Sequence, residues 1–461
     1  MFLKKIVAVK KKEVEQLKKE RPLNRFKSNV KKANHSFLRA LNSKKPSIIA
    51  EIKLKSPSKG MLNKKSDILT IAKQYDAADI QAISVLTDKK YFGGDISYIP
   101  QIKKITKKPI LRKDFIVDEY QIYEARDYGA DAILLIAEIL TREKINTFLK
   151  IARGLGMDVI VEAHEKMALK KILKTNANII GINNRDLHSL EMDKRTIQRL
   201  SSIIPKNKLL IAESGIESAI DIALLPTNVQ SALIGSSIMS SSDIQKKIRE
   251  LTSQKIKIKI CGNTNLEDAR AAINDGVDLL GFIVHTKKSL DNLSISEAKK
   301  IIKKINAPGK IVAVTQSTVL SELKEICREL IPDLIQLHGP VSISMITHIK
   351  KEFPNVRIIK GIPVISEKSI SVALTYTSVA DLLLLDSARG GSGKTHDWSI
   401  SKEIIKKSPI PVFLAGGLHP YNVAQAIKTV KPFGVDVNSG VRERPRKKNP
   451  EKVKQFINNA Q

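Results

Sequence analysis

The sequence predicts an α/β fold made of two tandem (β/α)8 barrels, for three reasons. Short runs of apolar, β-branched residues recur every few tens of residues, each followed by a turn and a stretch with helical spacing. The runs are apolar almost throughout, which is typical of parallel strands covered by helices on both faces. Eight such units fall in each half of the chain, and eight units in about 200–250 residues make a (β/α)8, or TIM, barrel.

A doubly wound open sheet is the alternative that the same periodicity allows. A dinucleotide-binding sheet of that kind would carry a G-x-G-x-x-G turn after its first strand, and the sequence has none. The chain has 461 residues, which is more than one hydrophobic core of about 250–300 residues can organise. Two barrels are therefore the favoured architecture.

The expected strands follow one another along both halves of the chain. In the first half they are 47–53, 82–88, 109–115, 132–137, 158–164, 179–185, 209–215 and 231–237. In the second half they are 257–262, 279–284, 310–315, 334–339, 357–362, 382–387, 411–417 and 434–440. Helical stretches between them, such as 121–132 and 265–278, close on a turn that contains glycine.

Two further features complete the expected organisation. The residues before the first strand predict an extra helix over 6–20 and an entry segment, an N-terminal extension placed to cover one barrel mouth. The boundary between the barrels is expected at Ser253 to Lys255, after the helical stretch 243–254. This divides the chain into domains 1–254 and 255–461.

Composition excludes several classes of protein. Hydrophobic residues make up 42% and charged residues 27% of the chain, a globular balance. Only two cysteines are present, which excludes a disulfide-stapled secreted scaffold. The apolar start is broken by Lys4 and Lys5, too short for a signal segment, and no window approaches the roughly 18 apolar residues of a membrane span. We expect a soluble, cytoplasmic protein without membrane contacts.

The formal net charge of +32 invites a nucleic-acid interpretation. Aromatic residues amount to only 4%, however, and the basic residues are not interleaved with them as a base-stacking surface needs. The lysines, among them the run near Lys10, are dispersed over polar stretches between the apolar runs. We expect solvated helix faces, with weak nonspecific polyanion contact as the alternative, and no specific nucleic-acid partner.

Polar residues interrupt the ends of the first-half strands, where barrel enzymes place their chemistry. These residues are Glu51, Lys53, Lys113, Asp114, Glu162, Asn183, Arg185, Glu213 and Ser214. Lysines and glutamates that converge on one mouth suit general acid–base work on a carboxylated substrate. Any one of them alone is better explained as a rim salt bridge, but five strand ends together favour an active site.

Phosphate binding is indicated after the last strands of each half. Small Ser and Gly residues there let backbone N–H groups approach an anion, which is the usual phosphate position in such barrels. The segments are AESGI and LIGSSIM in the first half, and FLAGGL, VNSGV and GGSGK in the second. One Gly-Gly pair alone would be only a tight turn, but corresponding places in both halves predict a phosphorylated small molecule in each barrel.

The second half places Cys261 at the end of its first strand and Asp386 at the end of its sixth. A thiol and a carboxyl across one barrel are able to share proton transfers to and from one substrate. Position alone leaves Cys261 open between this role and that of a small buried hydrophobe. Cys327 lies in a helical stretch, and we expect it only to pack.

At these residues two resemblances appear. Residues 1–251 resemble the indole-3-glycerol-phosphate synthases, through IIAEIKLKSPSKG, AISVLTDKKYFGG, PILRKDFIVDEYQIYEAR, GINNRDL, IAESGI and IGSSIM. Residues 256–461 resemble the phosphoribosylanthranilate isomerases, through KICGNTN, IQLHG, LLLLDSARGGSGKTHDWS and FLAGGL. Two such barrels in this order look like the fused bifunctional tryptophan-pathway enzymes of bacteria.

For the first barrel, the resemblance implies ring closure of a carboxyphenylamino deoxyribulose phosphate with loss of carbon dioxide and water. It implies that Lys113 is the general acid, that Lys53 holds the carboxylate and assists proton transfer, and that Glu162 is the partner acid/base. Glu51, Asn183 and Ser214 match supporting contacts. Gly215, Gly235 and Ser236 match the phosphate cradle, and Ser56, Phe115 and Arg185 match further substrate-binding positions.

For the second barrel, the resemblance implies an Amadori rearrangement that opens the ribosyl ring of phosphoribosylanthranilate. Cys261 matches the general base and Asp386 the general acid. The positions that match substrate or phosphate binding are Gln336, His338, Gly391, Ser392, Gly416, Gly417 and Ser439. The resemblance implies no cofactor or metal, and we expect a monomer whose partners are phosphorylated small molecules that carry a carboxylate.

Three departures from the isomerase pattern stand out. The family reads K-S-P-R after its second strand, with an arginine for the anthranilate carboxylate, whereas this chain has Leu290 or Asp291 there, with Lys287 and Lys288 as candidate surrogates. An aliphatic residue is replaced by Asn263. In the last segment a glutamate and a glycine are replaced by Arg442 and Arg446.

We favour a working enzyme with two activities. A synthase fused to a weakened or inactive isomerase barrel is the first alternative, and a basic binding protein that uses barrels as a scaffold is the second.

Overall fold

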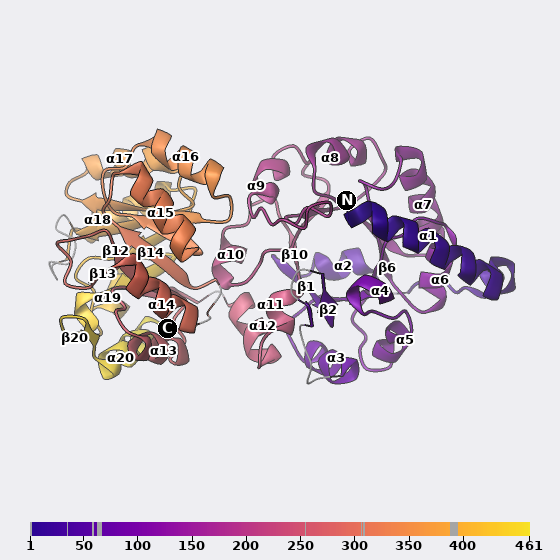
Figure 1. Ribbon diagram of the computed structural model, residues 1–461, viewed down its shortest axis with the longest axis horizontal. Helices are drawn as coiled ribbons and strands as arrows, with labels where there is room; N and C mark the ends of the chain where they lie inside the picture. Colours follow the sequence, from indigo (N-terminus) through magenta and orange to yellow (C-terminus); the bar gives the residue numbers. More distant parts are fainter. Residues whose placement is uncertain are drawn as a thin grey trace. The chain divides into compact units, whose positions relative to one another are not determined.

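The computed structural model describes residues 2–34, 36–57, 60–61, 67–253, 255–305, 307, 309–387 and 395–461. The chain divides into two compact units, residues 1–217 with 225–252, and residues 218–224 with 253–461. Each unit contains a closed ring of eight parallel strands surrounded by helices (Figure 1). The prediction of two tandem (β/α)8 barrels is confirmed.

The first barrel is closed because β1 pairs with both β10 and β4, all in parallel register. Its strands are β1 (Ser47–Ile52), β4 (Ala82–Leu86), β5 (Ile110–Lys113), β6 (Ala132–Ile136), β7 (Asp158–Ala163), β8 (Ile179–Asn183), β9 (Leu209–Glu213) and β10 (Ser231–Ile234). Almost every strand residue is buried, as expected for strands with side chains in the barrel interior and against the helices.

The helices of this part of the chain cover the strands, and α2, α3, α4, α7 and α10 begin at a Ser, Thr or Asp whose side chain accepts a hydrogen bond from the first turn. They are α1 (Phe2–Glu20), α2 (Phe37–Leu41), α3 (Ile68–Asp76), α4 (Lys89–Phe92), α5 (Tyr98–Lys103), α6 (Tyr120–Asp127), α7 (Arg142–Gly154), α8 (Lys166–Ile172), α9 (Thr196–Ser201), α10 (Ala219–Ala223), α11 (Ser236–Met239) and α12 (Ile244–Thr252). The short elements are η1 (Leu23–Arg25), η2 (Lys27–Asn29), β2 (Lys55–Ser56) and β3 (Gly60–Met61). Gly129, after α6, has a φ of 97°, which explains the glycine in that helix-to-strand turn.

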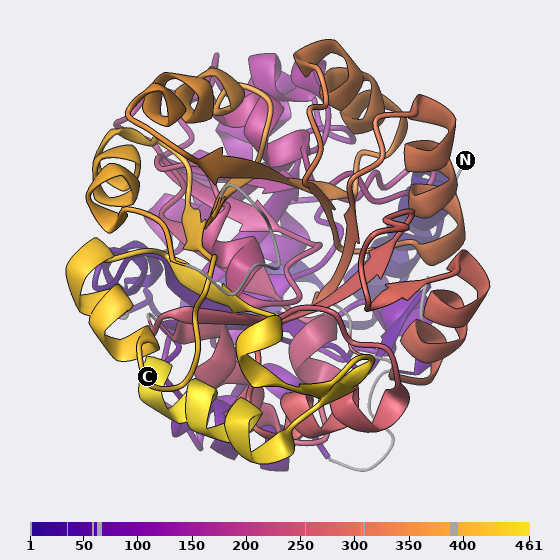
Figure 2. The same cartoon turned by 90° about the vertical axis from the view of Figure 1, so that its left-hand side faces the viewer.

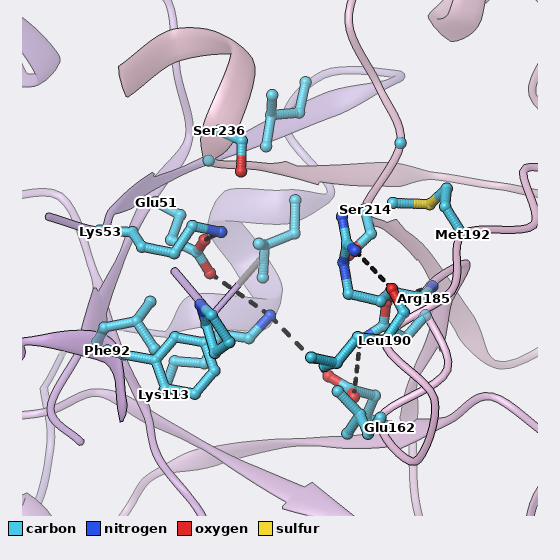
Figure 3. A pocket seen from close by; sticks show the side chains of 18 of the residues that line it. Glu51, Lys53, Phe92, Lys113, Glu162, Arg185, Leu190, Met192, Ser214 and Ser236 are labelled. Carbon is cyan, nitrogen blue, oxygen red and sulfur yellow. Dashed lines mark hydrogen bonds and ion pairs between the residues drawn. The ribbon is translucent and has the colours of Figure 1, made fainter. Parts of the chain in front are cut away.

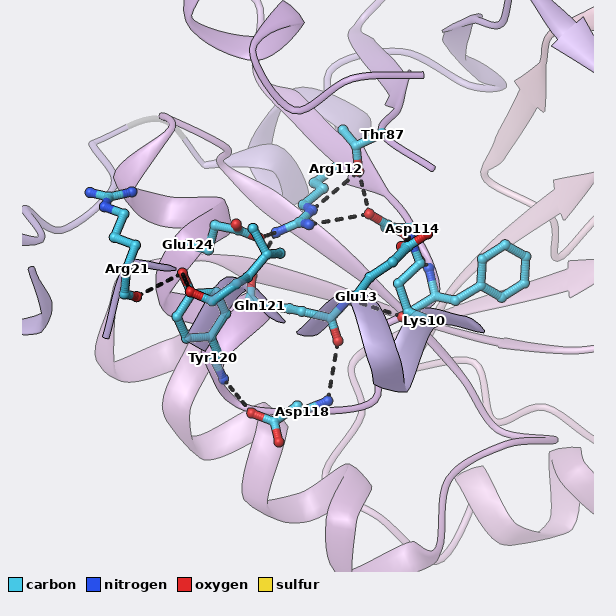
Figure 4. A network of polar contacts seen from close by, with 12 residues as sticks. Lys10, Glu13, Arg21, Thr87, Arg112, Asp114, Asp118, Tyr120, Gln121 and Glu124 are labelled. Atoms are coloured by element: carbon cyan, nitrogen blue, oxygen red, sulfur yellow. Dashed lines mark hydrogen bonds and ion pairs between the residues drawn. The ribbon is translucent and has the colours of Figure 1, made fainter. Parts of the chain in front are cut away.

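The N-terminal extension forms the predicted helix, and α1 packs on the first barrel through Leu3 and Ile6, which join its core. The expectation that the lysines near Lys10 face solvent is wrong for Lys10 itself, whose side chain is buried. Its ammonium group lies 2.8 Å from Glu13, 2.9 Å from Asp88 and 3.1 Å from Asp114 (Figure 4). Burial of Lys10 is possible because the carboxylates of Asp88 and Asp114 lie under the helix and pair with its ammonium group. Through Asp114, the residue after β5, Lys10 connects α1 to the barrel.

The carboxylate of Asp114 is held from the barrel side as well. Arg112 lies 3.1 Å from it, and the Thr87 hydroxyl donates a hydrogen bond of 2.6 Å to it (Figure 4). Burial alone would raise the pKa of Asp114, but the cations of Lys10 and Arg112 lower it to about 2. The carboxylate is therefore ionised and fixed between the extension and the strand end that carries Lys113.

The second barrel is closed by pairing of β11 with both β19 and β12. Figure 2 shows its strands enclosed by the orange and yellow helices. Its barrel strands are β11 (Lys257–Ile260), β12 (Leu279–Val284), β14 (Ile311–Thr315), β15 (Leu334–Leu337), β16 (Arg357–Val364), β17 (Leu382–Ser387), β18 (Val412–Leu414) and β19 (Gly434–Val437). The additional strands are β13 (Asn292–Leu293), β20 (Arg442–Arg444) and β21 (Lys447–Lys448).

Helices again alternate with the strands. They are α13 (Leu266–Asn274), α14 (Ile295–Ile305), α15 (Leu320–Leu330), α16 (Ile343–Glu352), α17 (Lys368–Tyr376), α18 (Trp398–Lys407), α19 (Val423–Val430) and α20 (Pro450–Ala460), with the short η3 (Ser439–Val441). Cys327 lies in α15 and belongs to the apolar core, as predicted. Among the described residues, no helix is long and apolar enough to cross a membrane.

Candidate functional site

The carboxyl ends of the first-barrel strands surround a cavity of about 350 Å³ (Figure 3). The predicted residues that line it are Glu51, Lys53, Lys113, Phe115, Glu162, Asn183, Arg185, Ser214, Gly215, Gly235 and Ser236. They come from six strand ends far apart in the sequence, which the parallel barrel brings to one mouth. Of Ser56 the structure describes only the backbone, in β2, so its predicted contact stays a prediction.

Lys113 occupies the middle of a ring of carboxylates (Figure 3). Its ammonium nitrogen lies 2.7 Å from Glu213, 3.5 Å from Glu51 and 3.9 Å from Glu162. Lys53 stands beside it and pairs with the other oxygen of Glu51 at 2.6 Å. Two lysines and three glutamates from four strand ends therefore form one continuous charged cluster.

The charges of this cluster shift one another's protonation. Burial alone would lower the pKa of Lys113, but Glu213, Glu51 and Glu162 hold it above its usual value, so the side chain is cationic. Burial would raise the pKa of Glu51, but Lys53 and Lys113 outweigh it and leave that pKa below its usual value.

Glu213 behaves differently from the other carboxylates. Burial, together with the neighbouring carboxyl of Glu162, raises the pKa of Glu213 to about 8, despite its bond to Lys113. The cluster therefore places a cationic acid, Lys113, in hydrogen-bond contact with a carboxyl group whose pKa is raised. Titratable groups whose pKa values are shifted by their neighbours are typical of sites for general acid–base catalysis.

Glu162 is oriented by its neighbour on β8. The Asn183 side chain donates a 3.0 Å hydrogen bond to Glu162 Oε1, and Asn183 Oδ1 accepts one of 2.9 Å from the backbone of Arg185. Glu162 Oε2 is buried and has no hydrogen-bond partner among the described residues. A buried carboxylate oxygen without a hydrogen bond is costly, and the ammonium group of Lys113, 3.9 Å from this oxygen, offsets part of that cost.

The predicted phosphate side has the tight backbone that an anion site needs. Ser214 and Gly215 have φ values of 67° and 78° directly after β9. A Cβ on Gly235 would lie 2.3 Å from Glu51 Oε1, so only glycine allows this close approach. Ser236 begins α11 on the opposite side of the cavity mouth from Glu162 (Figure 3).

Apolar side chains close the rest of the cavity, among them Phe92, Phe115, Leu187 and Met192. Phe2 and Ile6 of α1 also line it, so the extension reaches the mouth that it was expected to cover. Apolar side chains together with a charged cluster suit a substrate with an aromatic ring and anionic groups.

In the second barrel, Cys261 follows β11 and Asp386 lies in β17, and both are buried. Asp386 Oδ2 is 3.1 Å from His338 Nε2, and His338 Nδ1 is 3.1 Å from the Gln336 amide nitrogen. Gln336 and His338 were both predicted as substrate-binding residues, and the structure places them on the strand end next to the carboxyl.

Two charged residues inside this barrel were missed by the sequence analysis. Lys259 Nζ lies 3.0 Å from Asp436 Oδ1, and both are buried. Burial raises the pKa of the Cys261 thiol, while the ammonium group of Lys259 opposes that rise. The ammonium group of Lys259 favours the thiolate form, but it does not cancel the effect of burial, and the pKa of the Cys261 thiol stays above its usual value. A charged residue in the middle of an otherwise apolar strand, as in KIKIC and GVDV, was the available signal.

The phosphate loops of the second barrel are described in part. Gly416 has a φ of 78°, and a Cβ there would lie 3.0 Å from Asp386 Oδ1. Gly417 follows with a φ of 64°, and Ser439 begins η3 after β19. Gly391 and Ser392 lie outside the described residues, so their predicted roles stay predictions.

The departures from the isomerase pattern have distinct locations. Asn263 is buried and donates hydrogen bonds to the carbonyls of Ile260 (2.7 Å) and Gly281 (3.1 Å), so it fastens the turn after β11 to β12. Lys287 and Lys288 are exposed, and Leu290 is 61% exposed. Asp291, in contrast, is buried.

Comparison with known proteins divides the chain in the same way. Residues 3–251 match the family described as indole-3-glycerol phosphate synthase. Residues 258–459 match the family described as N-(5'phosphoribosyl)anthranilate (PRA) isomerase.

Full-length relatives are similar to both barrels together. The tryptophan biosynthesis protein TrpCF of Haemophilus influenzae is 35% identical over 99% of this chain and 96% of its own. The protein of the same name from Buchnera aphidicola subsp. Diuraphis noxia is 37% identical over 98% of this chain and 97% of its own. A solved phosphoribosylanthranilate isomerase from Thermotoga maritima is 34% identical, with a TM-score of 0.40, and covers 44% of this chain and 98% of its own.

Proposed function

We propose how the two barrels share their chemistry on the premise that the chain belongs to the indole-3-glycerol phosphate synthase family through its first barrel and to the N-(5'-phosphoribosyl)anthranilate isomerase family through its second. It is a bifunctional enzyme of tryptophan biosynthesis, and the full-length relatives give no support to a decayed second barrel. The synthase is assigned to residues 1–254 and the isomerase to residues 255–461.

The isomerase comes first in the reaction order. Asp386 protonates the ribosyl ring oxygen of phosphoribosylanthranilate, and the ring opens to an iminium ion. Cys261 then acts as the base that removes the proton from C2′, with Lys259 as the neighbouring cation that favours its deprotonated form, and the enolamine becomes the amino ketone. His338 holds Asp386 at 3.1 Å and so fixes the direction from which the proton is given.

The synthase then closes the indole ring of that product. The ring carbon that bears the carboxylate attacks the ketone carbon, while protonated Lys113 donates its proton to the ketone oxygen, which becomes a hydroxyl group. Carbon dioxide then leaves from the attacking ring carbon, and the electrons of the broken bond restore the aromatic ring. In the dehydration step Glu162 accepts a proton from the C1′ methylene, and the hydroxyl group leaves as water with a second proton from Lys53. Lys53 holds the carboxylate before it departs, and the apolar side chains receive the aromatic ring.

The observation that carries the synthase proposal is the position of Lys113, a cation with three buried carboxylates around it. We expect Lys113→Ala and Glu162→Gln each to abolish formation of indole-3-glycerol phosphate. The isomerase activity of the same chain should be unchanged, which shows that the variants are folded. Retained synthase turnover in either variant would contradict these roles.

The matched experiment addresses the second barrel. Cys261→Ser and Asp386→Asn should each abolish isomerisation of phosphoribosylanthranilate while synthase turnover persists. Because each barrel serves as the control for the other, a loss of both activities in one variant would point to unfolding.

The proposal also covers the localisation and the oligomeric state of the enzyme, whose substrates are small molecules that carry a phosphate and a carboxylate. We infer that it acts in the cytoplasm as a monomer. Light scattering should give a mass near the chain mass of 51.2 kDa, and a dimer mass would refute this part of the proposal.

A further inference from the structure

Two of the departures from the isomerase pattern meet in the structure. Asp291 follows β12, and Arg442 begins β20, after the last barrel strand. The Arg442 guanidinium donates a hydrogen bond from Nη2 to Asp291 Oδ2, and the same nitrogen lies 3.4 Å from Asn438 Oδ1. The loop after β12, where the family has an arginine, therefore carries the acid Asp291. The last segment, where the family has a glutamate, carries Arg442.

The third departure strengthens the same junction. The backbone N–H of Arg446 donates to Asp291 Oδ1 at 3.3 Å, and its side chain donates to the carbonyl of Asn292 at 2.9 Å. Arg446 also pairs with Glu297 at 3.1 Å on α14. Asp291, only 1% exposed, is thus held on both oxygens, and the hairpin of β20 and β21 is fixed to the loop after β12.

This ion pair lies beside the general base. A Cβ on Gly262, the residue after Cys261, would stand 2.7 Å from Asp291 Oδ2 and 2.7 Å from Asn438 Oδ1. The two segments that form the pair therefore pack directly on the turn that carries the thiol. Because Gly262 follows Cys261 directly, this packing places the pair of Asp291 and Arg442 at the end of the barrel that carries Cys261.

A second basic side chain, Lys448, lies at the same junction. Lys448, 3% exposed, donates to Asn438 Oδ1 at 2.6 Å and so shares that oxygen with Arg442. The nearby Asp268 is paired with Lys447 at 3.0 Å. Burial lowers the pKa of Lys448 to about 8, so Arg442 is the permanent cation at this junction, and it is oriented by Asp291.

Arg442 also has unused hydrogen-bonding capacity. Its Nε is buried and has no hydrogen-bond partner among the described residues. A buried guanidinium N–H without an acceptor is costly, and a planar carboxylate is the ligand that a guanidinium fork matches best.

We propose that Arg442, held by Asp291, binds the carboxylate of the isomerase substrate, in place of the arginine that the family carries after its second strand. The inference rests on the proposed function of the second barrel. The anthranilate group is attached to C1′, next to the C2′ from which Cys261 takes the proton, so its carboxylate lies on the side of the base. The phosphate on C5′ lies across the ribose, toward Gly416 and Gly417.

This assignment replaces the surrogates that the sequence suggested. Lys287 and Lys288 are exposed, whereas Arg442 is partly buried and oriented by an ion pair. An oriented cation in a partly desolvated place binds an anion better than a solvated, mobile one, because less conformational entropy is lost on binding.

The first test separates the carboxylate from the phosphate. Arg442→Met should raise the isomerase KM by about 10- to 100-fold, the effect of one lost charge-assisted hydrogen bond or pair, while kcat changes less. Two reduced product analogues, one with the ring carboxylate and one with an unsubstituted phenyl ring, serve as inhibitors. The variant should lose affinity for the first and keep its affinity for the second.

The second test exchanges the charges. Arg442→Glu should abolish measurable affinity of the isomerase for the carboxylated inhibitor, because two acids then face the ligand carboxylate. Asp291→Arg alone should weaken that affinity, because two guanidinium groups then repel each other. The double variant Asp291→Arg/Arg442→Glu restores the family arrangement and should recover affinity to within about tenfold of the parent, as one charge pair replaces another.

Synthase turnover is the control in every variant. An unchanged KM in Arg442→Met, equal loss of both inhibitors, or a double variant no better than Arg442→Glu would overturn the inference while leaving the proposed function intact. If the unaltered chain itself fails to isomerise phosphoribosylanthranilate, the proposed function of the second barrel fails, and the role of Arg442 fails with it.

Discussion

A Lys10→Met substitution tests whether buried ion pairs hold the N-terminal helix on the synthase barrel. Methionine keeps most of the apolar stem and removes the charge. The ammonium group of Lys10 is 2.9 Å from Asp88 and 3.1 Å from Asp114, and neither carboxylate is more than 2% exposed in its side chain. The substitution therefore leaves two buried carboxylates with one cation fewer.

The burial of the ion pair decides how much the substitution lowers the free energy of unfolding. Breaking a buried pair by removing one partner costs about 3–5 kcal/mol. Lys18, on the same helix, pairs with Asp118 at a similar 2.8 Å, but its side chain is 43% exposed, and pairs of that kind contribute about 0–1 kcal/mol. Lys18→Met is thus a control with the same chemistry, the same helix and nearly the same distance.

The assay is the urea dependence of synthase activity. With a slope of about 3 kcal/mol per molar urea, Lys10→Met should lower the midpoint by about 1 M or more and Lys18→Met by about 0.3 M or less. The chain has one tryptophan, Trp398 in α18, so its fluorescence reports the second barrel and should not change. Equal midpoints for the two variants would refute the reasoning.

The pH dependence supplies an independent check. The pKa of Asp114 is lowered to about 2, so its contribution to stability is complete above its unfolded pKa near 4 and is lost as the pH falls toward 2. The pKa of Lys10 is raised above its usual value, so its contribution is lost only at strongly alkaline pH. The difference between Lys10→Met and the parent should therefore be constant from pH 6 to 9 and narrow below pH 4.

Two further predictions concern the synthase cavity. Burial raises the pKa of Glu213 to about 8, so the synthase kcat/KM should fall above about pH 8, where ionised Glu213 adds negative charge to a site for anions. Glu213→Gln should remove that fall, and a pH profile of the variant identical to that of the parent would contradict this role. Gly235→Ala places a Cβ 2.3 Å from Glu51 Oε1 and should lower synthase turnover at least about tenfold through displacement of the carboxylate. The control Gly154→Ala, at a position where a Cβ meets nothing within 4 Å, should leave turnover unchanged.

The barrel strands and the strand-end residues are predictable from sequence because both follow from local pattern. A parallel strand covered on both faces is apolar throughout, and closure of the barrel brings its carboxyl ends together. Lys53, Lys113 and Glu162 interrupt such strands at their ends, so their meeting follows from the fold alone.

What the sequence does not reveal is which charged side chains the folded chain pairs across long distances. Lys10 stands in a lysine-rich helix and looks like its neighbours, and only the position of Asp88 and Asp114 under the helix makes it different. Glu213 is visible at its strand end, but its raised pKa depends on how deeply it is buried beside Glu162, which no local pattern records.

The second barrel shows why the net charge of +32 is a poor guide to function. Most of the described lysines of this barrel are exposed, whereas the partners Asp291 and Arg442 are both departures from the family pattern. Replacing a single member of an ion pair next to the base would leave a buried charge unpaired, at a cost of several kcal/mol. Exchanging both charges keeps the pair neutral and keeps a guanidinium group at the mouth, although a different loop now supplies it. On the proposal made above, selection for carboxylate binding acts on the pair rather than on either position, which is why a sequence that has lost the expected arginine keeps a second barrel with Cys261 and Asp386 intact.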